Sequence, residues 1–374
     1  MKFQRLVVAV VFFVLTLVLF RVFDERSKIK YPPGITIVKV ISKFKSEPKE
    51  EYFGSGFFID NKYIATSNHV VELIKNSMRQ KAEVTIFDGK DTHPAKIVGF
   101  DSDTDVALLE PLSWCGIKIQ TPCFRTVSEK DIRQAVIVYP SPPSWSLLHS
   151  WFDSFLYRNL SLRSSDNRFG AKVLKGYIAG FEDWIGIKVI RHLSGIMPGY
   201  SGTPLLDTNN CYVGMNFKYD RFRLSVSYAI SNDNLQPTFR EIKERGYVET
   251  SFLGLAVGQG DDGVYILAVA KNGPAEVLDK YGIQVLELKN LTSPELVVRY
   301  RIYKINGTEI RNIKELWTAI RGLKPGNSVQ VVLKDMDNKV YAENIKLVSR
   351  FHFIQKYSLI DLDFVQDSYL VAVI

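Results

Sequence analysis

The sequence is poor in cysteine and histidine, with three Cys and five His among 374 residues. These residues are too few and too scattered for a zinc site, which gathers Cys and His ligands at short spacings. Cys115 and Cys123 are eight residues apart, and Cys211 stands alone. A disulfide between the first two in an oxidising compartment and three unpaired buried thiols are both compatible with this spacing.

The chain also lacks a Walker motif and a dinucleotide-binding glycine motif, so we expect neither a cofactor nor a metal. A strongly basic folded body is missing as well, although the net charge is +8. The first 50 residues hold ten Lys/Arg and four Asp/Glu, which leaves 38 basic and 36 acidic groups for the remaining 324 residues. Nucleic-acid binding needs clustered positive charge on the folded body, so nucleic acid is not an expected partner.

The basic excess flanks a hydrophobic N-terminal segment. Leu6–Phe20 contains no charged residue and, extended past Arg21 to Phe23, is just long enough to cross a bilayer. We interpret residues 1–23 as a transmembrane signal anchor in contact with membrane lipid, followed by a juxtamembrane linker at 24–32. A cleaved signal peptide is the alternative, and we favour the anchor because no small-x-small cleavage site follows.

Between this linker and residue 246 the sequence is rich in short strand signals. Apolar, β-branched runs alternate with Gly, Asp and Pro, which is typical of barrels rather than of βαβ units. A helix predicted over Asn234–Gly246 closes the region, with Gly246 as its stop signal. The expected strands are Ile35–Ile41, Gly54–Ile59, Ala82–Phe87, Ala95–Val98, Val106–Leu109, Ala135–Val138, Gly186–Ile190, Cys211–Phe217 and Leu224–Ile230.

Three polar residues of this region indicate nucleophilic catalysis. His69 precedes a Val-Val pair, Asp105 precedes a Val-Ala-Leu-Leu run, and Ser201 lies in a Gly-Tyr-Ser-Gly turn. Serine needs a base to take its proton, histidine suits that task near neutral pH, and a carboxylate fixes the imidazole tautomer. Glycines beside a serine let backbone N–H groups converge on an oxyanion. The order His, Asp, Ser is that of chymotrypsin-like enzymes.

The chain resembles the HtrA (Deg) family of serine proteases over roughly residues 33–348. The resemblance implies a mainly β fold, with a trypsin-like double antiparallel β-barrel at 33–246 and an α+β PDZ domain at 250–348. HtrA relatives are often trimeric, so a homo-oligomer is a further expectation. The segments that carry the resemblance are Gly54–Asp60, Thr66–Val71, Thr104–Leu109 and Gly199–Leu206.

The resemblance also implies a role for each motif residue. His69 is the expected general base and Asp105 its orienting acid, both on the first barrel. Ser201 is the expected nucleophile on the second barrel, with the active site in the cleft between the two. The N–H groups of Gly199 and Ser201 are the expected oxyanion hole.

Two positions depart from the family pattern. Tyr200 stands where the family usually has Asn, and Thr203 stands where it usually has Gly. Neither position supplies a triad side chain, so an active protease remains the expectation. The alternative is a catalytically quiet PDZ adaptor or chaperone that retains the protease fold, with Tyr200 altering the oxyanion loop.

Specificity is partly encoded near the nucleophile. In trypsin-like folds the base of the S1 pocket lies six residues before the serine, and Gly195 occupies that position. A pocket without a carboxylate has no partner for a Lys or Arg side chain, so small or medium apolar P1 residues are expected. The strand expected to pair with the substrate backbone by β-augmentation comprises Ser225, Val226, Ser227, Tyr228 and Ala229.

Residues 140–170 are an unusual insertion. Apolar residues follow helical spacing there, at Leu148, Trp151, Phe152, Phe155 and Leu156. A helix packed on the barrel is the expected structure, and an interfacial membrane helix, an oligomer contact and a lid are the alternatives.

The second unit, 250–348, has its own signature. Asn312 with Glu315 begins a helix by a capping-box pattern, and a strand is expected over Val329–Leu333. The tail, 349–374, is either an extra strand or an apolar ligand for a PDZ groove. The loop expected to hold the carboxylate of a C-terminal peptide comprises Phe252, Leu253, Gly254 and Leu255.

The sequence therefore predicts a single-pass, membrane-anchored serine endopeptidase whose catalytic and PDZ domains lie outside the cytoplasm. Its expected partners are misfolded or regulatory polypeptide substrates and C-terminal peptides.

Overall fold

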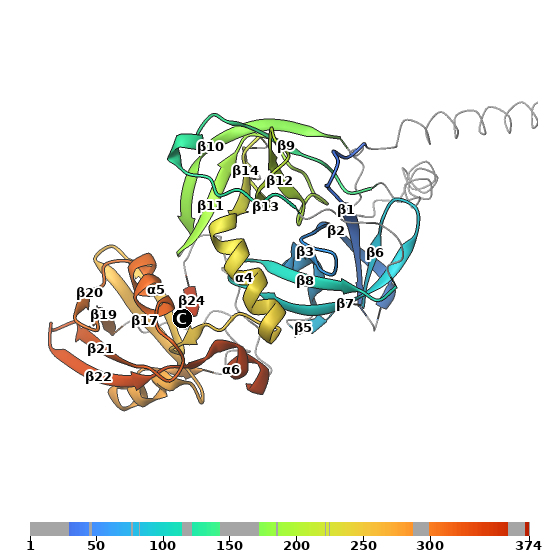
Figure 1. Ribbon diagram of the computed structural model, residues 1–374. Coiled ribbons are helices and arrows are strands. Elements are labelled where there is room, and N and C mark those ends of the chain that lie inside the picture. The colour runs from blue at the N-terminus through green and yellow to red at the C-terminus, as the bar shows by residue number, and fades with distance from the viewer. Residues whose placement is uncertain are drawn as a thin grey trace, which may run out of the picture.

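The computed structural model describes residues 30–44, 47–75, 78–81, 83–113, 122–142, 172–184, 186–220, 222–223, 225–286, 299–357 and 371–373. The expected N-terminal anchor, the helix expected at 148–156 and Cys115 lie outside these residues. Within them, no helix combines the length and apolarity that a membrane crossing requires. Two closed barrels and a separate sheet domain make up the described structure (Figure 1).

The first barrel joins six antiparallel strands in the order β1-β2-β3-β8-β7-β6. Strands β3 and β8 are buried along most of their length. Their apolar side chains contribute to the core of this barrel. The strands are β1 Ile37–Phe44, β2 Glu47–Phe58, β3 Ile64–Ser67, β6 Glu83–Phe87, β7 Thr92–Asp101 and β8 Val106–Pro111. A short helix α2, Asn68–Val71, leaves β3 and leads into the hairpin β4 Glu72–Lys75 and β5 Met78–Lys81.

The second barrel closes in the order β10-β11-β14-β13-β12-β9. A 3-10 turn, η1 Glu129–Asp131, precedes it. The strands are β9 Ala135–Val138, β10 Leu174–Trp184, β11 Ile187–His192, β12 Pro204–Asp207, β13 Tyr212–Tyr219 and β14 Ser227–Ser231. The expectation of a mainly β chain with two antiparallel barrels is therefore confirmed.

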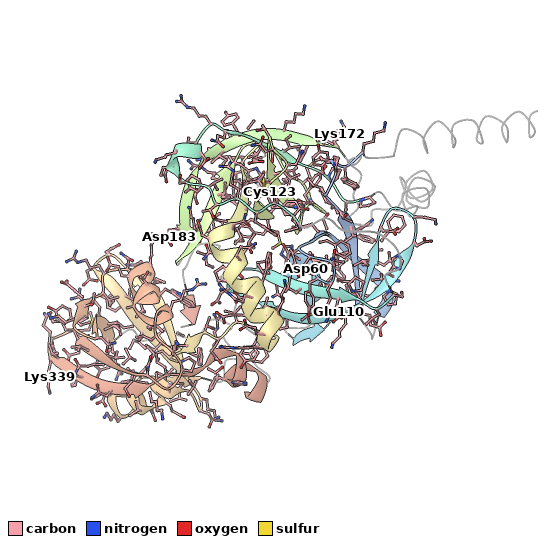
Figure 2. The ribbon with its side chains drawn as sticks, in the orientation of Figure 1. Asp60, Glu110, Cys123, Lys172, Asp183 and Lys339 are labelled. Carbon is pink, nitrogen blue, oxygen red and sulfur yellow. A yellow bond between two sulfur atoms is a disulfide. The ribbon has the colours of Figure 1, made fainter. Side chains whose placement is uncertain are left out.

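Helix α4, Asn232–Arg245, follows the second barrel and packs against both barrels. The predicted helix is confirmed, with its start two residues earlier because the Ser231 side chain caps it by accepting from the Asp233 N–H. Gly246 ends the helix in the left-handed region at φ 82°. Lys243, one turn before this end, pairs with Asp60 of the first barrel at 2.5 Å, which lies beside α4 in Figure 2.

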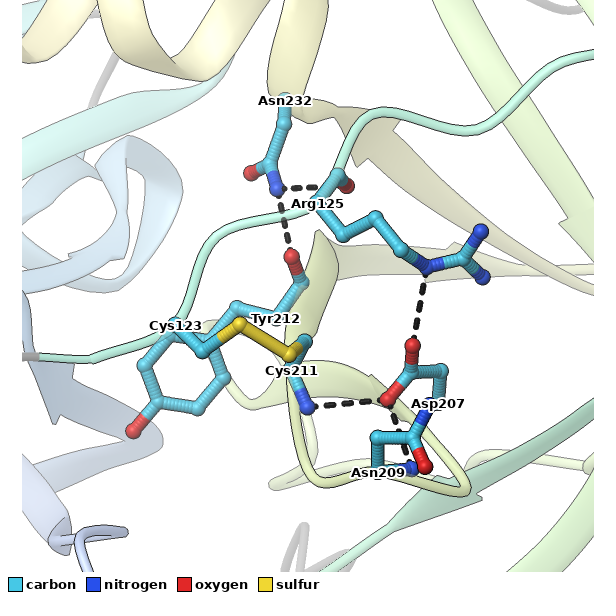
Figure 3. The surroundings of a disulfide bond; sticks show 7 residues. All are labelled: Cys123, Arg125, Asp207, Asn209, Cys211, Tyr212 and Asn232. Carbon is cyan, nitrogen blue, oxygen red and sulfur yellow. Dashed lines mark hydrogen bonds and ion pairs between the residues drawn. A yellow bond between two sulfur atoms is a disulfide. The ribbon is translucent and has the colours of Figure 1, made fainter.

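A disulfide joins Cys123 to Cys211 (Figure 3). Both alternatives that the sequence left open, a pairing of Cys115 with Cys123 and three free thiols, are therefore wrong. The connector between the barrels runs back along the start of β13, where the Tyr212 N–H donates to the Cys123 carbonyl at 2.7 Å. The Arg125 N–H donates in turn to the Tyr212 carbonyl at 2.9 Å. These contacts place the two cysteines side by side although they are 88 residues apart.

We expect the double variant Cys123→Ser/Cys211→Ser to unfold at lower urea concentration than the native chain. A cross-link that closes a loop of this length stabilises by about 4–5 kcal/mol in the chain-entropy model. Urea unfolding with and without dithiothreitol measures the difference. The reductant should destabilise the native chain and leave the double variant unchanged, and equal stability of the two oxidised proteins would refute the expectation.

The remaining sheet forms a second domain in the order β22-β21-β19-β17-β16-β24, with β18 paired to β17 and β20 paired to β19. Its core lies between this sheet, α5 and the 3-10 segment η2. The elements are β16 Leu255–Gly260, β17 Gly263–Ala270, η2 Pro274–Tyr281, β18 Val285–Leu286, β19 Tyr300–Ile305, β20 Thr308–Glu309, α5 Ile313–Arg321, β21 Ser328–Asp335, β22 Val340–Lys346 and β24 Val371–Val373.

Helix α5 begins as the sequence predicts. The Asn312 side chain accepts from the Glu315 N–H at 2.8 Å and caps the first turn. Leu316, Trp317 and Ile320 are buried on the face that meets the sheet. A two-stranded ladder, β15 Ser251–Phe252 with β23 Val348–Ser349, closes the base of the domain, and α6, Arg350–Tyr357, follows it.

Candidate active site

The structure brings His69 and Asp105 together at the end of the first barrel. His69 lies in α2, directly after β3, and Asp105 directly precedes β8, the strand that pairs with β3. The two residues therefore leave neighbouring strands at the same edge. Gly54 lies beneath α2, where a Cβ atom would come within 2.5 Å of the Val70 side chain. Only glycine lets the short helix approach the barrel so closely.

Asp105 contacts His69 through both of its carboxylate oxygens. Oδ2 lies 2.7 Å from the imidazole Nδ1, and Oδ1 accepts from the His69 N–H at 2.9 Å. The Asp105 carbonyl also accepts from the Asn68 N–H at 3.0 Å. Because a carboxylate only accepts, Nδ1 carries the proton and Nε2 is left as the basic nitrogen. The ring orientation and tautomer are those that a general base requires.

Ser201 lies in the loop between β11 and β12, and this loop is tied to the first barrel. The Ser55 N–H of β2 donates to the Ser201 carbonyl at 2.8 Å. Gly202 follows at φ 86°, and a Cβ atom there would lie 2.0 Å from the Ser55 carbonyl oxygen. The contact between the two barrels therefore requires glycine after the serine. Half-buried Ser201 directs its hydroxyl toward the Phe217 carbonyl of β13, at 3.4 Å.

The backbone before Ser201 is arranged as a turn that exposes N–H groups. The Gly199 carbonyl accepts from Ser55 Oγ at 2.6 Å, and the Tyr200 carbonyl accepts from Thr203 Oγ1 at 2.6 Å. In a planar trans peptide the N–H points opposite to the carbonyl, so the Ser201 N–H points away from Thr203. In the described part of the chain, the N–H groups of Gly199 and Ser201 donate to no protein acceptor.

Tyr200 and Thr203 anchor this turn through buried side chains. The Tyr200 side chain is 4% exposed and belongs to the apolar core of the second barrel. Its hydroxyl donates to the Lys172 carbonyl at 2.7 Å, and burial raises its pKa. Asn216 on β13 donates to Thr203 Oγ1 at 3.0 Å. The side chains at both departures from the family pattern are therefore buried and anchor the loop.

Gly195 lies beside part of the strand expected to pair with substrate. Its N–H donates to the Ser225 carbonyl at 3.2 Å, and the Ile196 N–H donates to Ser227 Oγ at 2.9 Å. However, β14 pairs with β11 on one edge and with β13 on the other. Its main chain is used in closing the barrel. Ser227, Tyr228 and Ala229 lie in β14 and are paired on both edges, so this part of the expected substrate strand is wrong. Ser225 and Val226 precede β14, and their pairing with a substrate backbone stays a prediction.

Another strand segment lies beside Ser201, and no local sequence pattern marks it. The pairing of β13 with β12 ends at Met215, whereas its pairing with β14 continues to Tyr219. Phe217–Tyr219 therefore have an edge with no strand partner among the described residues, and the Phe217 carbonyl on this segment faces the Ser201 hydroxyl. The closing pattern of the barrel, which only the fold reveals, distinguishes this edge from β14.

A second histidine, His192, precedes the Gly195 turn and differs from His69 in being buried. His192 is fully buried, and its Nδ1 lies 2.9 Å from Ser194 Oγ. Burial lowers the pKa of His192 to about 3, and the nearby Asn216 side chain acts in the opposite direction. His192 is therefore uncharged at neutral pH and serves the packing of the loop rather than proton transfer.

This buried imidazole should make the fold sensitive to acid. The folded-state pKa lies below the ordinary value of about 6.5, so the unfolded chain binds the proton first as the pH is lowered. The free energy of unfolding therefore decreases as the pH is lowered from about 6.5 to 3. At pH 5 the effect is about 2 kcal/mol. We expect His192→Gln to remove this part of the acid sensitivity. Urea unfolding at pH 7 and pH 5 tests it, and parallel losses in both proteins would contradict the assignment.

Comparisons with known proteins agree with this geometry. The family model described as a trypsin-like peptidase domain matches residues 54–215, which include all three triad candidates. The chain is 26% identical over 338 residues to the serine protease Do-like HtrA of Bacillus subtilis, covering 80% of this chain and 65% of that protein. It is 25% identical over 307 residues to a DegP-like protein of Chlamydia trachomatis, named a probable periplasmic serine endoprotease, covering 78% of this chain and 52% of that one.

The fold is similar to that of a serine endoprotease from Yersinia pestis, with a TM-score of 0.56, 18% identity, and coverage of 84% of this chain and 94% of that one. The chain thus spans 65% and 52% of the length of the two curated relatives described. Two closed barrels, the family-model match over residues 54–215 and these relatives lead to one assignment: the chain carries a trypsin-like peptidase domain and is similar over most of its length to the HtrA (Deg) serine proteases.

Proposed function

We propose that the protein is a serine endopeptidase that cleaves polypeptides with the triad His69, Asp105 and Ser201. The observation that carries this proposal is the paired hydrogen bonding of Asp105 to His69 at 2.7 and 2.9 Å. The Asp105–His69 pair lies at the edge of the first barrel where Ser55 is hydrogen-bonded to the Ser201 loop. A carboxylate-oriented imidazole on one barrel and a serine on a glycine turn of the other would supply the base and the nucleophile that acyl transfer needs.

The reaction follows from these positions. His69 Nε2 removes the proton from Ser201 Oγ as the oxygen attacks the scissile carbonyl carbon, and Asp105 stabilises the imidazolium. The N–H groups of Gly199 and Ser201 donate to the oxyanion of the tetrahedral intermediate. His69 then returns the proton to the departing amine, and a water molecule hydrolyses the acyl-enzyme by the same steps.

Substrate binding is assigned to the turn at Gly195 and to the end of β13 beyond its ladder with β12. Phe217–Tyr219 would pair with an extended substrate backbone by β-augmentation. Gly195 contributes no charge to the proposed S1 pocket, so we propose small or medium apolar P1 residues. Tyr200 supports an active enzyme over a quiet adaptor, because its side chain lies in the barrel core and away from the oxyanion turn.

Ser201→Ala is expected to abolish hydrolysis of fluorescein-labelled casein and labelling by a fluorophosphonate, with no loss of folding. Asp105→Asn keeps the shape of the side chain but favours the wrong His69 tautomer, so kcat should fall by up to about 10⁴-fold. Thr208→Ala, in the exposed turn after β12, is a matched surface control. Casein hydrolysis by Ser201→Ala at the native rate would overturn the protease proposal.

We further propose that the second domain is a PDZ domain that binds apolar C-terminal peptides. The carbonyls of Leu253 and Gly254 accept from the N–H groups of Ala275 and Ala270 at 3.0 and 2.8 Å. The N–H groups of Gly254 and Leu255 consequently point to the opposite side, where a carboxylate can be held. Helix α5 lies along β16 and is joined to it by Gln259, whose Oε1 accepts from the Ile313 N–H at 3.0 Å.

We also propose that residues 1–23 anchor the protein in a membrane with both domains outside the cytoplasm. The disulfide between Cys123 and Cys211 supports this placement, because such bonds form and persist in oxidising compartments. The uncharged run Leu6–Phe20 supports the anchor.

A further inference from the structure

The loop that carries Asp105 is held in a conformation that few residues adopt. Asp105 has φ 51°, in the left-handed region where a side chain other than glycine is unusual. The Asp101 carboxylate accepts from Thr104 Oγ1 at 2.6 Å and from the Asp103 N–H at 3.2 Å. Such a conformation persists only when its surroundings fix it. Any group that fixes residues 101–105 therefore also fixes the carboxylate that orients His69.

One of these groups comes from outside the protease barrels. Arg350, the first residue of α6, forms an ion pair and hydrogen bond with the Asp103 carboxylate, and both side chains are only 10% exposed. The Arg350 N–H donates to the Thr250 carbonyl at 3.0 Å, and its guanidinium lies 5.6 Å from the centre of the Trp317 ring of α5. Arg350 thus joins the interdomain linker, the second domain and the Asp105 loop.

An apolar contact next to this ion pair holds the same junction. Tyr247, directly after α4, forms an isolated bridge with Phe100 at the end of β7. Its ring stacks on that of Phe351 with centroids 4.1 Å apart. The backbone beside Arg350 is therefore held in place as well as its guanidinium group.

The charges in the loop explain why a cation is needed there. Burial and the neighbouring Asp103 carboxylate raise the pKa of Asp101 to about 6, with Arg321 acting in the opposite direction. Without Arg350, Asp103 would be a buried charge next to a second carboxyl group. A buried charge without its partner is strongly destabilising, so the loop would move toward water and take Asp105 with it.

We propose that Arg350 is a positioning residue of the catalytic triad, acting through Asp103 to hold the carboxylate of Asp105 against His69. The proposal rests on the proposed peptidase activity. Under this proposal, contacts at the junction with the second domain help to position the active-site residues. A displacement of about 1 Å in a catalytic group can lower the rate by about 10²-fold, so we expect kcat to fall by about 10- to 100-fold when Arg350 loses its charge.

The test compares Arg350→Met, Arg350→Lys and Arg311→Met. Arg311 is a matched control because its ion pair with Glu309 lies on the exposed surface of the same domain. With an internally quenched apolar peptide as substrate, Arg350→Met should lower kcat and leave KM within about twofold. Arg350→Lys should recover part of kcat, and Arg311→Met should match the native enzyme. Amide exchange at residues 101–106 should accelerate in Arg350→Met alone.

Two outcomes overturn the proposal: a folded Arg350→Met protein with native kcat, or native exchange at 101–106 in that protein. If the single variant does not fold, Asp103→Asn/Arg350→Met removes both buried charges, and it should fold and show the same loss of kcat. If the native chain neither cleaves the peptide nor reacts with a fluorophosphonate, the peptidase proposal fails. The exchange comparison then decides the positioning role alone.

A second, independent observation concerns the edge of β16. Strand β24 pairs with β16 in antiparallel register, with Val373 opposite Ala256 and Val371 opposite Gly258. The other edge of β16 is paired with β17. We infer that β24 is an internal occupant of the proposed peptide site, since it uses the edge at which a peptide would add a strand. This inference rests on the proposed peptide-binding function.

A tethered strand competes with free peptide at an effective concentration of about 1 mM, so external peptides should bind weakly until β24 is displaced. The probe is a fluorescein-labelled peptide with the sequence of residues 367–374. Val371→Pro/Ala372→Pro removes at least one donor to β16, because strand N–H groups alternate between edges. This variant should bind the probe at least about tenfold more tightly than the native chain or the control Val371→Ala/Ala372→Ser.

Equal probe affinity in the native and double-proline proteins would overturn internal occupancy. Absence of binding in every protein would reject the peptide-binding proposal. Amide exchange of β16 then tests the docking of β24 by itself, because loss of a paired strand should accelerate exchange at residues 255–260. Unchanged exchange in the double-proline protein would overturn it.

Discussion

Ser55 is the residue on which the active site depends most. Its N–H donates to the Ser201 carbonyl, its hydroxyl donates to the Gly199 carbonyl, and its own carbonyl accepts from Thr66 Oγ1. Ser201, the proposed nucleophile, and the His69 imidazole belong to different barrels, so their separation is set by how one barrel meets the other. A single strand residue defines that meeting point, through two hydrogen bonds to the Ser201 loop and one to its own barrel. Gly202 is required by the same constraint, because any larger residue would collide with the Ser55 carbonyl.

The apolar packing around this contact holds the two barrels in one arrangement. A single core cluster includes Phe57 of the first barrel, Met215 of the second and Phe239 of α4. Phe57 meets Tyr212 edge-on at 4.9 Å, directly after the disulfide at Cys211. A hydrogen bond contributes only modestly to net stability, so apolar packing supplies most of the free energy that holds the two barrels together. The hydrogen bonds of Ser55 fix the orientation of the Ser201 loop within this packed interface.

The sequence carries more information about the residues of the site than about their partners. His69, Asp105 and the Gly-rich turn at Ser201 could be proposed from the sequence. The proposed roles of base, orienting carboxylate and nucleophile each require a particular residue type within a short local pattern. The partner of Cys123 could not be predicted in this way, since the return of the connector along β13 depends on the fold. The expected substrate strand included Ser227–Ala229 of β14 for a similar reason. A strand of alternating residues does not reveal which edge closes a barrel, and Phe217–Tyr219 are distinguished only by where β12 stops pairing.

Long-range ion pairs are still less visible in a sequence. Asp103 lies two residues before a recognisable catalytic position and looks like an ordinary turn residue, while Arg350 follows the expected PDZ region by two positions. Nothing local links residues that are 247 apart. Their pairing required the structure, and so did the stacking of Tyr247 on Phe351 beside it.

Helix α5 is the element common to the two proposed devices. Its first residue is bonded to Gln259 of β16, and its Trp317 lies beside the Arg350 guanidinium. A ligand on β16 can influence Asp105 only if it binds more tightly to one arrangement of this helix than to another. A preference of about 1.4 kcal/mol would change the equilibrium between two such arrangements tenfold. That is comparable to the loss of one charge-assisted hydrogen bond, so the Arg350–Asp103 pair is strong enough to set such an equilibrium.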